Sequence, residues 1–208
     1  MTTDAILDEL EVLFPDAECE LVHSNAYELL IAVILSAQTT DVAVNKITPA
    51  LFERFPTPQL LAAADVSEIE PYLRSIGLYR NKARSIQACA QALVEKHGGN
   101  VPSTMKELTA LAGCGRKTAN VVLSVAFNVP AIAVDTHVER VSKRLGLAKA
   151  NDSVLEVEKK LKRKIKRERW NKSHHLFIFF GRYLCMARNP HCEQCPFQTI
   201  CKRKRIEA

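Results

Sequence analysis

Apolar residues recur at helical spacing along nearly the whole chain, whereas the strict alternation that marks a β-strand is almost absent. The segment 27–37 is apolar on most faces, which predicts a helix buried at the centre of a domain. Proline and glycine stand where helices should end, as Pro15 and Gly98-Gly99 do. We therefore predict an all-α protein. The expected helices cover 3–13, 27–37, 42–54, a segment from 58, 68–76, 81–97, a short helix capped by Ser103, 116–127, a segment from 135 or 136, a basic helix after 153, and 174–184.

Several helix boundaries carry their own chemical signal. Ser67 with Glu70, and Ser153 with Glu156, have the spacing of a capping box, in which each side chain accepts from the other residue's backbone N–H. Gly77 stands where a helix would end on a left-handed glycine. These signals predict short connections between consecutive helices.

The length of 208 residues predicts one domain or two small ones. The longest apolar run, Leu29–Leu35, is too short to span a membrane. The first ten residues contain neither the basic nor the apolar region of a secretory signal, so we expect a cytoplasmic protein.

Positive charge is in excess and unevenly distributed. The net charge is +6 and the sequence pI is about 9.0, which favours an anionic partner such as nucleic acid. Residues 159–169 contain eight lysines and arginines against Glu168, and KRKR follows at 202–205. A solvated helix face and a frayed tail explain these two runs equally well.

A glycine-rich turn lies between two predicted helices, at Leu111-Ala112-Gly113-Cys114-Gly115. It leads into Arg116 and Lys117, so its backbone N–H groups would face outward at a helix N-terminus and could bind a DNA phosphate. We expect Gly115 to need a backbone geometry or close approach that a Cβ would spoil. An ordinary corner between helices is the alternative.

Lys117 and Asp135 are the candidates for covalent chemistry. At a helix N-terminus, beside Arg116 and partly shielded from water, Lys117 would be biased toward its neutral, nucleophilic form. Asp135 begins a helix and could be only its N-cap, just as Lys117 could only pair with a phosphate. Eighteen positions separate the two residues, one helix plus a return loop, so both side chains could reach one cleft.

Four of the seven cysteines fall within 17 residues near the C-terminus. In a cytoplasmic chain such clustering favours a metal site over disulfides. Structural zinc usually binds two closely paired hooks, and only one such pair is present, so the wider spacing favours the larger iron–sulfur cubane. The candidate ligands are Cys185, Cys192, Cys195 and Cys201.

Together these motifs resemble those of the endonuclease III family of helix–hairpin–helix DNA glycosylases, over nearly the whole chain. The resemblance implies a six-helix barrel at 21–130, with the hairpin at about 108–127, and a second domain made of 1–20 and 131–208. That second domain would carry a 4Fe-4S cluster on the four cysteines, and a DNA cleft would separate the domains. The segments that carry the resemblance are 35–41 (LSAQTTD), 113–120 (GCGRKTAN), 134–137 (VDTH) and the four cysteines.

By this resemblance the protein excises oxidised pyrimidines from duplex DNA. Lys117 would attack C1′ and displace the base, and the resulting Schiff base would undergo β-elimination and nick the strand 3′ to the site. Asp135 would activate the lysine and stabilise the cationic sugar. A monomer is implied, in the bacterial cytoplasm and associated with the nucleoid through its DNA. Its substrates would be duplexes containing damaged pyrimidines or abasic sites.

The resemblance also implies which residues touch DNA: Gly113, Cys114, Gly115, Arg116, Gln38, Asp41, Leu78 and His137. Gln38 or Leu78 would fill the gap left by the flipped base; alternatively, Leu78 tucks under the following helix as part of a helix cap. The hairpin departs from the family's usual Leu-Pro-Gly-Val-Gly by having Ala112 and Cys114. Loss of the proline frees the turn in the unfolded state, at about 0.4–1 kcal/mol.

Two other functions fit parts of the pattern. A sister family that removes adenine opposite oxidised guanine shares the cluster and the aspartate, but it typically lacks the lysine and carries an extra C-terminal domain. A non-catalytic DNA-binding module would need the hairpin alone. The presence of both Lys117 and Asp135 favours the bifunctional glycosylase and lyase.

Overall fold

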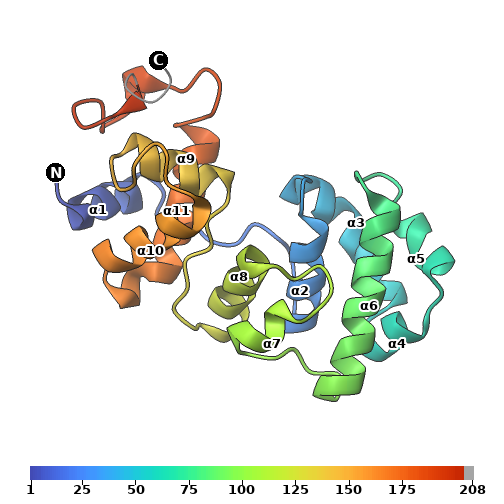
Figure 1. Ribbon diagram of the computed structural model, residues 1–208. Helices are drawn as coiled ribbons and strands as arrows, with labels where there is room; N and C mark the ends of the chain where they lie inside the picture. The colour runs from blue at the N-terminus through green and yellow to red at the C-terminus, as the bar shows by residue number, and fades with distance from the viewer. Residues whose placement is uncertain (204–208) are drawn as a thin grey trace. The chain divides into compact units, whose positions relative to one another are not determined.

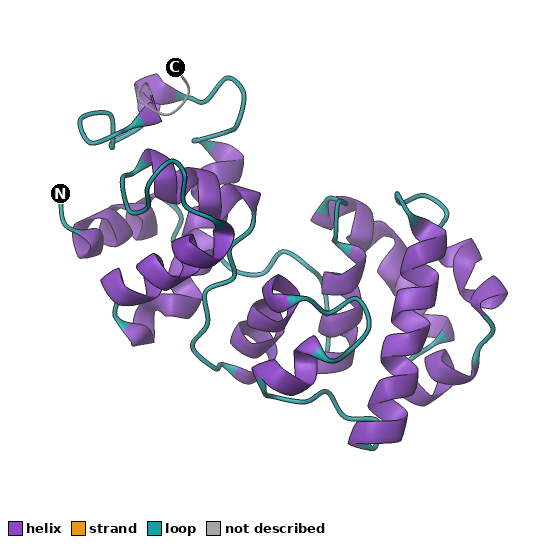
Figure 2. Cartoon of the chain, viewed as in Figure 1, coloured by secondary structure: helices purple, strands orange, loops and turns teal. Residues whose placement is uncertain are grey.

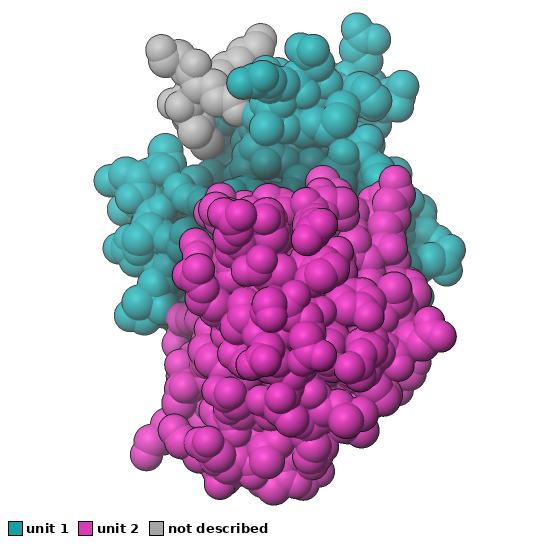
Figure 3. Space-filling model, turned by 90° about the vertical axis from the view of Figure 1, so that its right-hand side faces the viewer, with its two compact units in different colours: residues 1–19, 129–208 teal, residues 20–128 magenta. Residues whose placement is uncertain are grey.

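The computed structural model describes residues 1–203, and these are helical, with no strand among them (Figures 1 and 2). The all-α prediction is confirmed. Within this described part, no helix is both long and apolar enough to cross a membrane. The chain forms two compact units, Glu20–Asn128 and Met1–Cys19 with Val129–Ala208, coloured separately in Figure 3. Lys204 and Arg205, part of the basic tail, lie outside the described residues.

The unit 20–128 is built around α2 (Ala26–Leu35), which is buried on nearly all sides as its uniform hydrophobicity predicted. Helix α8 packs against α2, and the long helix α6 packs against α4 and α5. Gly98 ends α6 in the left-handed conformation, with φ +59°. The other helices of this unit are α3 (Asp41–Arg54), α4 (Pro58–Ala63), α5 (Val66–Leu73), α6 (Tyr79–His97), α7 (Met105–Thr109) and α8 (Arg116–Phe127).

The second unit packs α1 and α9 against α11 around a core that includes Leu7, Val141 and Phe177. A Cβ on Gly181 of α11 would lie 3.0 Å from the Cβ of His137, so this glycine permits the close approach of α9. The elements of this unit are α1 (Thr3–Leu13), α9 (Thr136–Arg144), α10 (Val154–Lys164), the 3₁₀ turn Arg167–Arg169, α11 (Trp170–Tyr183) and the 3₁₀ turn Cys192–Gln194.

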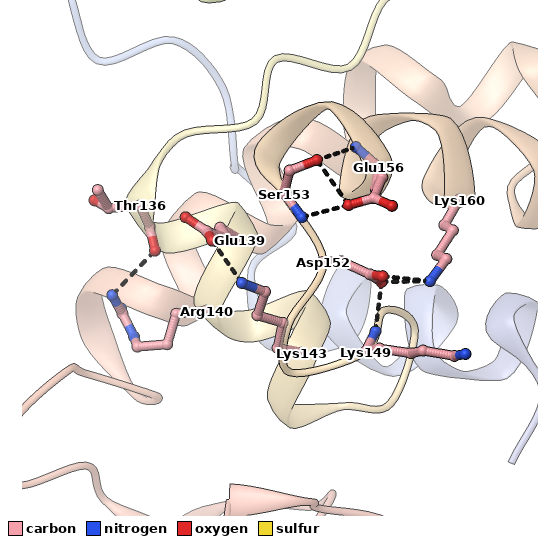
Figure 4. A network of polar contacts seen from close by, with 9 residues as sticks. All are labelled: Thr136, Glu139, Arg140, Lys143, Lys149, Asp152, Ser153, Glu156 and Lys160. Atoms are coloured by element: carbon pink, nitrogen blue, oxygen red, sulfur yellow. Dashed lines mark hydrogen bonds and ion pairs between the residues drawn. The ribbon is translucent and has the colours of Figure 1, made fainter. Parts of the chain in front are cut away.

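The capping signals were only partly assigned correctly. The Ser153–Glu156 box is present at the start of α10, where the Ser153 N–H donates to Glu156 at 2.7 Å (Figure 4). The predicted box at residues 67 and 70 is wrong. Because α4 ends at Ala63, the extended Ala64 places Asp65 at the N-cap of α5, and Glu68 accepts from its N–H at 3.0 Å.

A similar shift by one residue occurs before α7. Thr104, and not Ser103, is the N-cap, and its Oγ1 accepts from the Glu107 N–H at 3.2 Å. The glutamate three residues after Thr104 is the signal that distinguishes the two hydroxyl residues.

Half of the eight cations in the basic run 159–169 form ion pairs inside their own unit. Lys160 binds Asp152 at 2.6 Å (Figure 4), and Lys162 binds Glu158 at 2.7 Å. Arg169 bonds Asp8 at 2.7 Å. The explanation by a solvated helix face therefore fits this segment better than a DNA-binding surface does.

Candidate active site and cluster-binding segment

The glycine-rich turn joins α7 to α8, and its first glycine is required by the backbone. Gly113 has φ +74°, and a Cβ there would come within 2.9 Å of Ile34 Cγ2. The Cys114 N–H donates to the Leu111 carbonyl at 3.1 Å and the thiol is buried, which raises its pKa to about 11. The Cys114 amide is thus bonded within the turn and its thiol is buried, and contact of this residue with DNA stays a prediction.

The backbone of Gly115 does not have the special geometry that the sequence predicted. Its φ of −76° is available to any residue, and a Cβ there would meet nothing within 4 Å. Backbone geometry therefore does not require this glycine. It is the N-cap of α8 and has no side chain, so no side chain caps the positive end of this helix. This arrangement fits an anion from outside the chain.

Lys117 lies in this first turn of α8. Residues 118–124 are buried against the core, whereas Lys117 is exposed, and its Nζ makes no hydrogen bond or ion pair within the described residues. The partial shielding expected for Lys117 is absent from the free protein, so shielding would have to come with bound DNA. The amine itself is accessible to a ligand.

Asp135 caps α9, as expected, and does so with a single oxygen. Its Oδ1 accepts from the His137 and Val138 N–H groups at 2.9 and 2.8 Å. No hydrogen bond to Oδ2 occurs among the described residues. The structural and chemical roles therefore do not compete, because the cap leaves the second oxygen available. Asp135 and Lys117 belong to different units.

His137 is held inside its own unit. Arg140 Nη2 lies 3.3 Å from His137 Nδ1 and donates to the Gly181 carbonyl at 2.8 Å. Burial lowers the pKa of His137, with Asp135 opposing the shift, so the imidazole is neutral at neutral pH. Arg140 Nε also donates to the Cys185 carbonyl at 3.2 Å, which joins the start of α9 to the cysteine-rich segment.

The residues predicted to enter the duplex share a backbone feature. Gln38, after α2, has φ +54°, and Leu78, just before α6, has φ +59°. Both are exposed, with Leu78 at 56%. The interpretation of Leu78 as a contact tucked under α6 is wrong. Gly77 does not adopt a left-handed φ, so the leucine carries the conformation expected of the glycine.

Two further DNA-contact candidates each stand at the first position of a helix. Asp41 is the first residue of α3, following the N-cap Thr40, where a carboxylate stabilises the helix dipole. Arg116 is exposed at the first position of α8. Gly113 of the hairpin lies against Ile34 of α2 and Ser85 of α6.

The four C-terminal cysteines form one electrostatic group. Burial raises the pKa of the Cys195 thiol, the Phe197 N–H opposes that rise, and charges on the other three thiols add to it. Arg144 Nη1 donates to Cys185 Sγ at 3.3 Å, and Arg203 Nη1 lies 3.6 Å from Cys192 Sγ. Four neighbouring thiols, three of them with an N–H donor at the sulfur, suit a thiolate-bound iron–sulfur cluster. Among the described side chains, no three converge closely enough for one metal ion.

Two buried cations in these sites were not identified from the sequence. Arg144 is 2% exposed and donates to the Met186 carbonyl at 2.7 Å, while its own carbonyl accepts from the Lys202 N–H, so it holds both ends of the cysteine segment. The sequence did contain a signal for the burial of Arg144, since this residue continues the buried face of the helix formed by Val138 and Val141. Lys82 is 6% exposed in the first turn of α6, where the sequence shows only a polar stretch.

Comparison with known proteins adds independent findings. Residues 31–167 match the family described as HhH-GPD superfamily base excision DNA repair protein, and residues 185–201 match the iron-sulfur binding domain of endonuclease III. The endonuclease III of Bacillus subtilis (strain 168) is 56% identical over 94% of this chain and 90% of that protein. The endonuclease III of Escherichia coli (strain K12) is 44% identical over 96% of this chain and 94% of that protein. A solved trapped endonuclease III–DNA covalent intermediate has a TM-score of 0.94 and 57% identity over 99% of both chains.

Proposed function

The chain belongs to the endonuclease III family, and from this premise we propose that Lys117 is the nucleophile with which it excises oxidised pyrimidines from duplex DNA. As a family member it is a DNA glycosylase and AP lyase of base excision repair, with an iron–sulfur binding segment. The observation that carries the assignment of Lys117 is its exposed amine in the first turn of α8, beside an uncapped helix N-terminus.

The reaction begins at C1′ of the damaged nucleotide. The neutral amine of Lys117 attacks C1′, the bond to the base breaks, and the base leaves with that electron pair and takes up a proton. The sugar ring then opens to a Schiff base between Lys117 and C1′. Removal of a C2′ proton expels the 3′ phosphate, which nicks the strand on that side.

Asp135 supports this chemistry through Oδ2, while Oδ1 holds the first turn of α9. A carboxylate fixed in this way can accept a proton from the Lys117 ammonium and stabilise positive charge on the sugar. Because its orientation is set by two backbone N–H groups, it does not have to reorganise during the reaction.

The hairpin and the two left-handed turns handle the duplex. The N-terminal end of α8, which no N-cap side chain caps, binds a backbone phosphate, and the open space at Gly115 lets that phosphate approach. Leu78 and Gln38 enter the stack where the damaged base is flipped out. Both residues are exposed in a left-handed conformation that is unfavourable for their side chains, which supports a role with DNA.

Cys185, Cys192, Cys195 and Cys201 would hold a 4Fe-4S cluster. When bound, the cluster would crosslink the segment 185–201 to itself, and Arg144 and Arg140 would connect this segment to α9. The substrates are duplexes with damaged pyrimidines or abasic sites, bound by one copy of the chain in the bacterial cytoplasm.

Borohydride reduction tests the nucleophile directly, because it converts a Schiff base into a permanent protein–DNA adduct. Wild-type protein with a thymine glycol duplex should give this adduct, and Lys117→Gln should not. Lys106→Gln is the matched control, since Lys106 is an exposed lysine on the preceding hairpin helix. Undiminished trapping by Lys117→Gln would assign the reaction to another amine. Activity on adenine opposite oxidised guanine instead would favour the sister family.

A further inference from the structure

Within residues 1–203, two of the four non-glycine residues with positive φ are asparagines, which tolerate that conformation, and the other two are Gln38 and Leu78. These two residues lie on separate turns, one after α2 and one before α6. Both turns must present their side chains to the same gap in a duplex. Base flipping therefore depends on the distance between these two turns, and a contact between them must fix that distance.

Lys82 makes that contact. Its backbone N–H donates to the Leu78 carbonyl at 3.0 Å, closing the first turn of α6 directly behind Leu78. Its Nζ donates to Thr39 Oγ1 at 2.5 Å, and Thr39 is the residue after Gln38. The Thr39 N–H in turn donates to the Ser36 carbonyl at 3.1 Å, which closes the turn that contains Gln38. One side chain thus joins both turns.

The charge of Lys82 is unfavourable for the fold itself. The residue is 6% exposed, and among the described residues no carboxylate pairs with its ammonium, so burial lowers its pKa. A buried cation that makes one hydrogen bond to a neutral hydroxyl is less favourable than an apolar side chain of the same shape. Stability therefore does not explain the residue, whereas its position between the two turns does.

We propose that Lys82 is a positioning residue that fixes the separation of the Gln38 and Leu78 turns so that both side chains enter the gap left by the flipped base. It touches neither substrate nor the reacting atoms, and it acts through the two residues that it holds. This inference rests on the proposed function, in which Gln38 and Leu78 enter the stack.

The test uses Lys82→Met, which keeps the length of the side chain and removes the ammonium, and Thr39→Val, which removes only the acceptor. Lys96→Met is the control, because Lys96 is an exposed lysine in the last turn of the same helix. Single-turnover excision is measured for thymine glycol opposite adenine. It is compared with cleavage of an abasic site in single-stranded DNA, where nothing has to be unstacked.

We expect Lys82→Met and Thr39→Val each to slow excision from the stable pair by about tenfold or more, because misplaced Gln38 and Leu78 side chains lose the productive geometry. The double variant should be no slower than either single variant, since the two substitutions remove the same contact between Lys82 and Thr39. Cleavage of the single-stranded abasic site should stay within about twofold of wild type. The unfolding temperature of Lys82→Met should be unchanged or raised. Equal losses on both substrates, or no loss on the stable pair, would overturn the inference.

Hydrogen exchange separates failure of this inference from failure of the proposed function. Amides in 36–40 and 76–80 should exchange faster in both Lys82→Met and Thr39→Val, and not in Lys96→Met, whether or not the protein excises a base. Inactive wild-type protein with this exchange pattern would refute the proposed function and leave the contact established. Active protein in which Lys82→Met leaves both segments unaffected would refute the positioning role.

Discussion

Leu78 either enters the DNA stack as a wedge or packs in the protein core. Substitution of Leu78 by glycine distinguishes these two roles, because they predict opposite patterns of stability and activity. The leucine occupies a left-handed conformation that costs it about 1–2 kcal/mol, and glycine adopts that conformation without this cost. The wedge role therefore predicts a protein that folds normally and opens DNA poorly.

Relief of this strain and the losses that oppose it change the free energy of unfolding of Leu78→Gly by similar amounts. Leu78 is 56% exposed, so removing its side chain forfeits about half of the 1.5–3 kcal/mol of a fully buried leucine, or about 1 kcal/mol. The added freedom of glycine in the unfolded chain costs about 0.4–1 kcal/mol. The stability of Leu78→Gly should therefore fall within about 1 kcal/mol of wild type. Leu78→Ala loses the same contact and keeps the strain, so its Tm should fall by about 2–4 °C.

Excision is compared on two substrates, thymine glycol in a stable pair and the same lesion in a mismatch. Both variants of Leu78 should slow excision from the stable pair and affect the mismatch less, because unstacking is easier there. A large drop in Tm for Leu78→Gly, with excision from the two substrates reduced equally, would show that Leu78 is a core residue. The wedge would then lie elsewhere.

Four further variants test the candidate site residues. Gly115→Ala should leave Tm unchanged and weaken binding to damaged and undamaged duplexes alike in a fluorescence titration, because phosphate contacts carry no lesion information. Gly113→Ala should instead lower Tm, since φ is +74° and Ile34 lies 2.9 Å from the added Cβ. Asp135→Asn should keep the cap of α9 and the affinity for DNA, but slow single-turnover excision by about 100-fold or more, and a smaller loss would leave Asp135 only a cap. Cys192→Ser should reduce iron below about four atoms per chain by metal analysis, whereas undiminished iron would remove Cys192 from the ligand set.

Those properties of this protein that depend on near neighbours in the chain could be predicted from the sequence. Helical spacing of apolar residues led to the all-α class and to the buried helix α2, and Ser153 with Glu156 marked the start of α10. The Gly-x-Gly turn before Lys117 and the spacing of the four cysteines identified the candidate chemistry. In each case the interacting groups lie within a few residues of one another, so a local pattern contains the information.

Only the tertiary structure decided properties that depend on which distant segments meet. Of the two hairpin glycines, Gly113 is the one without room for a side chain, because Ile34 of α2 packs against it. Four of the eight cations in the basic run 159–169 are ion-paired, and Arg169 pairs with Asp8 of α1. Lys82 resembles a surface residue in the sequence, yet it is buried where α6 meets the turn containing Thr39. The energy of a charge depends on its surroundings, and packing between segments far apart in the chain creates those surroundings.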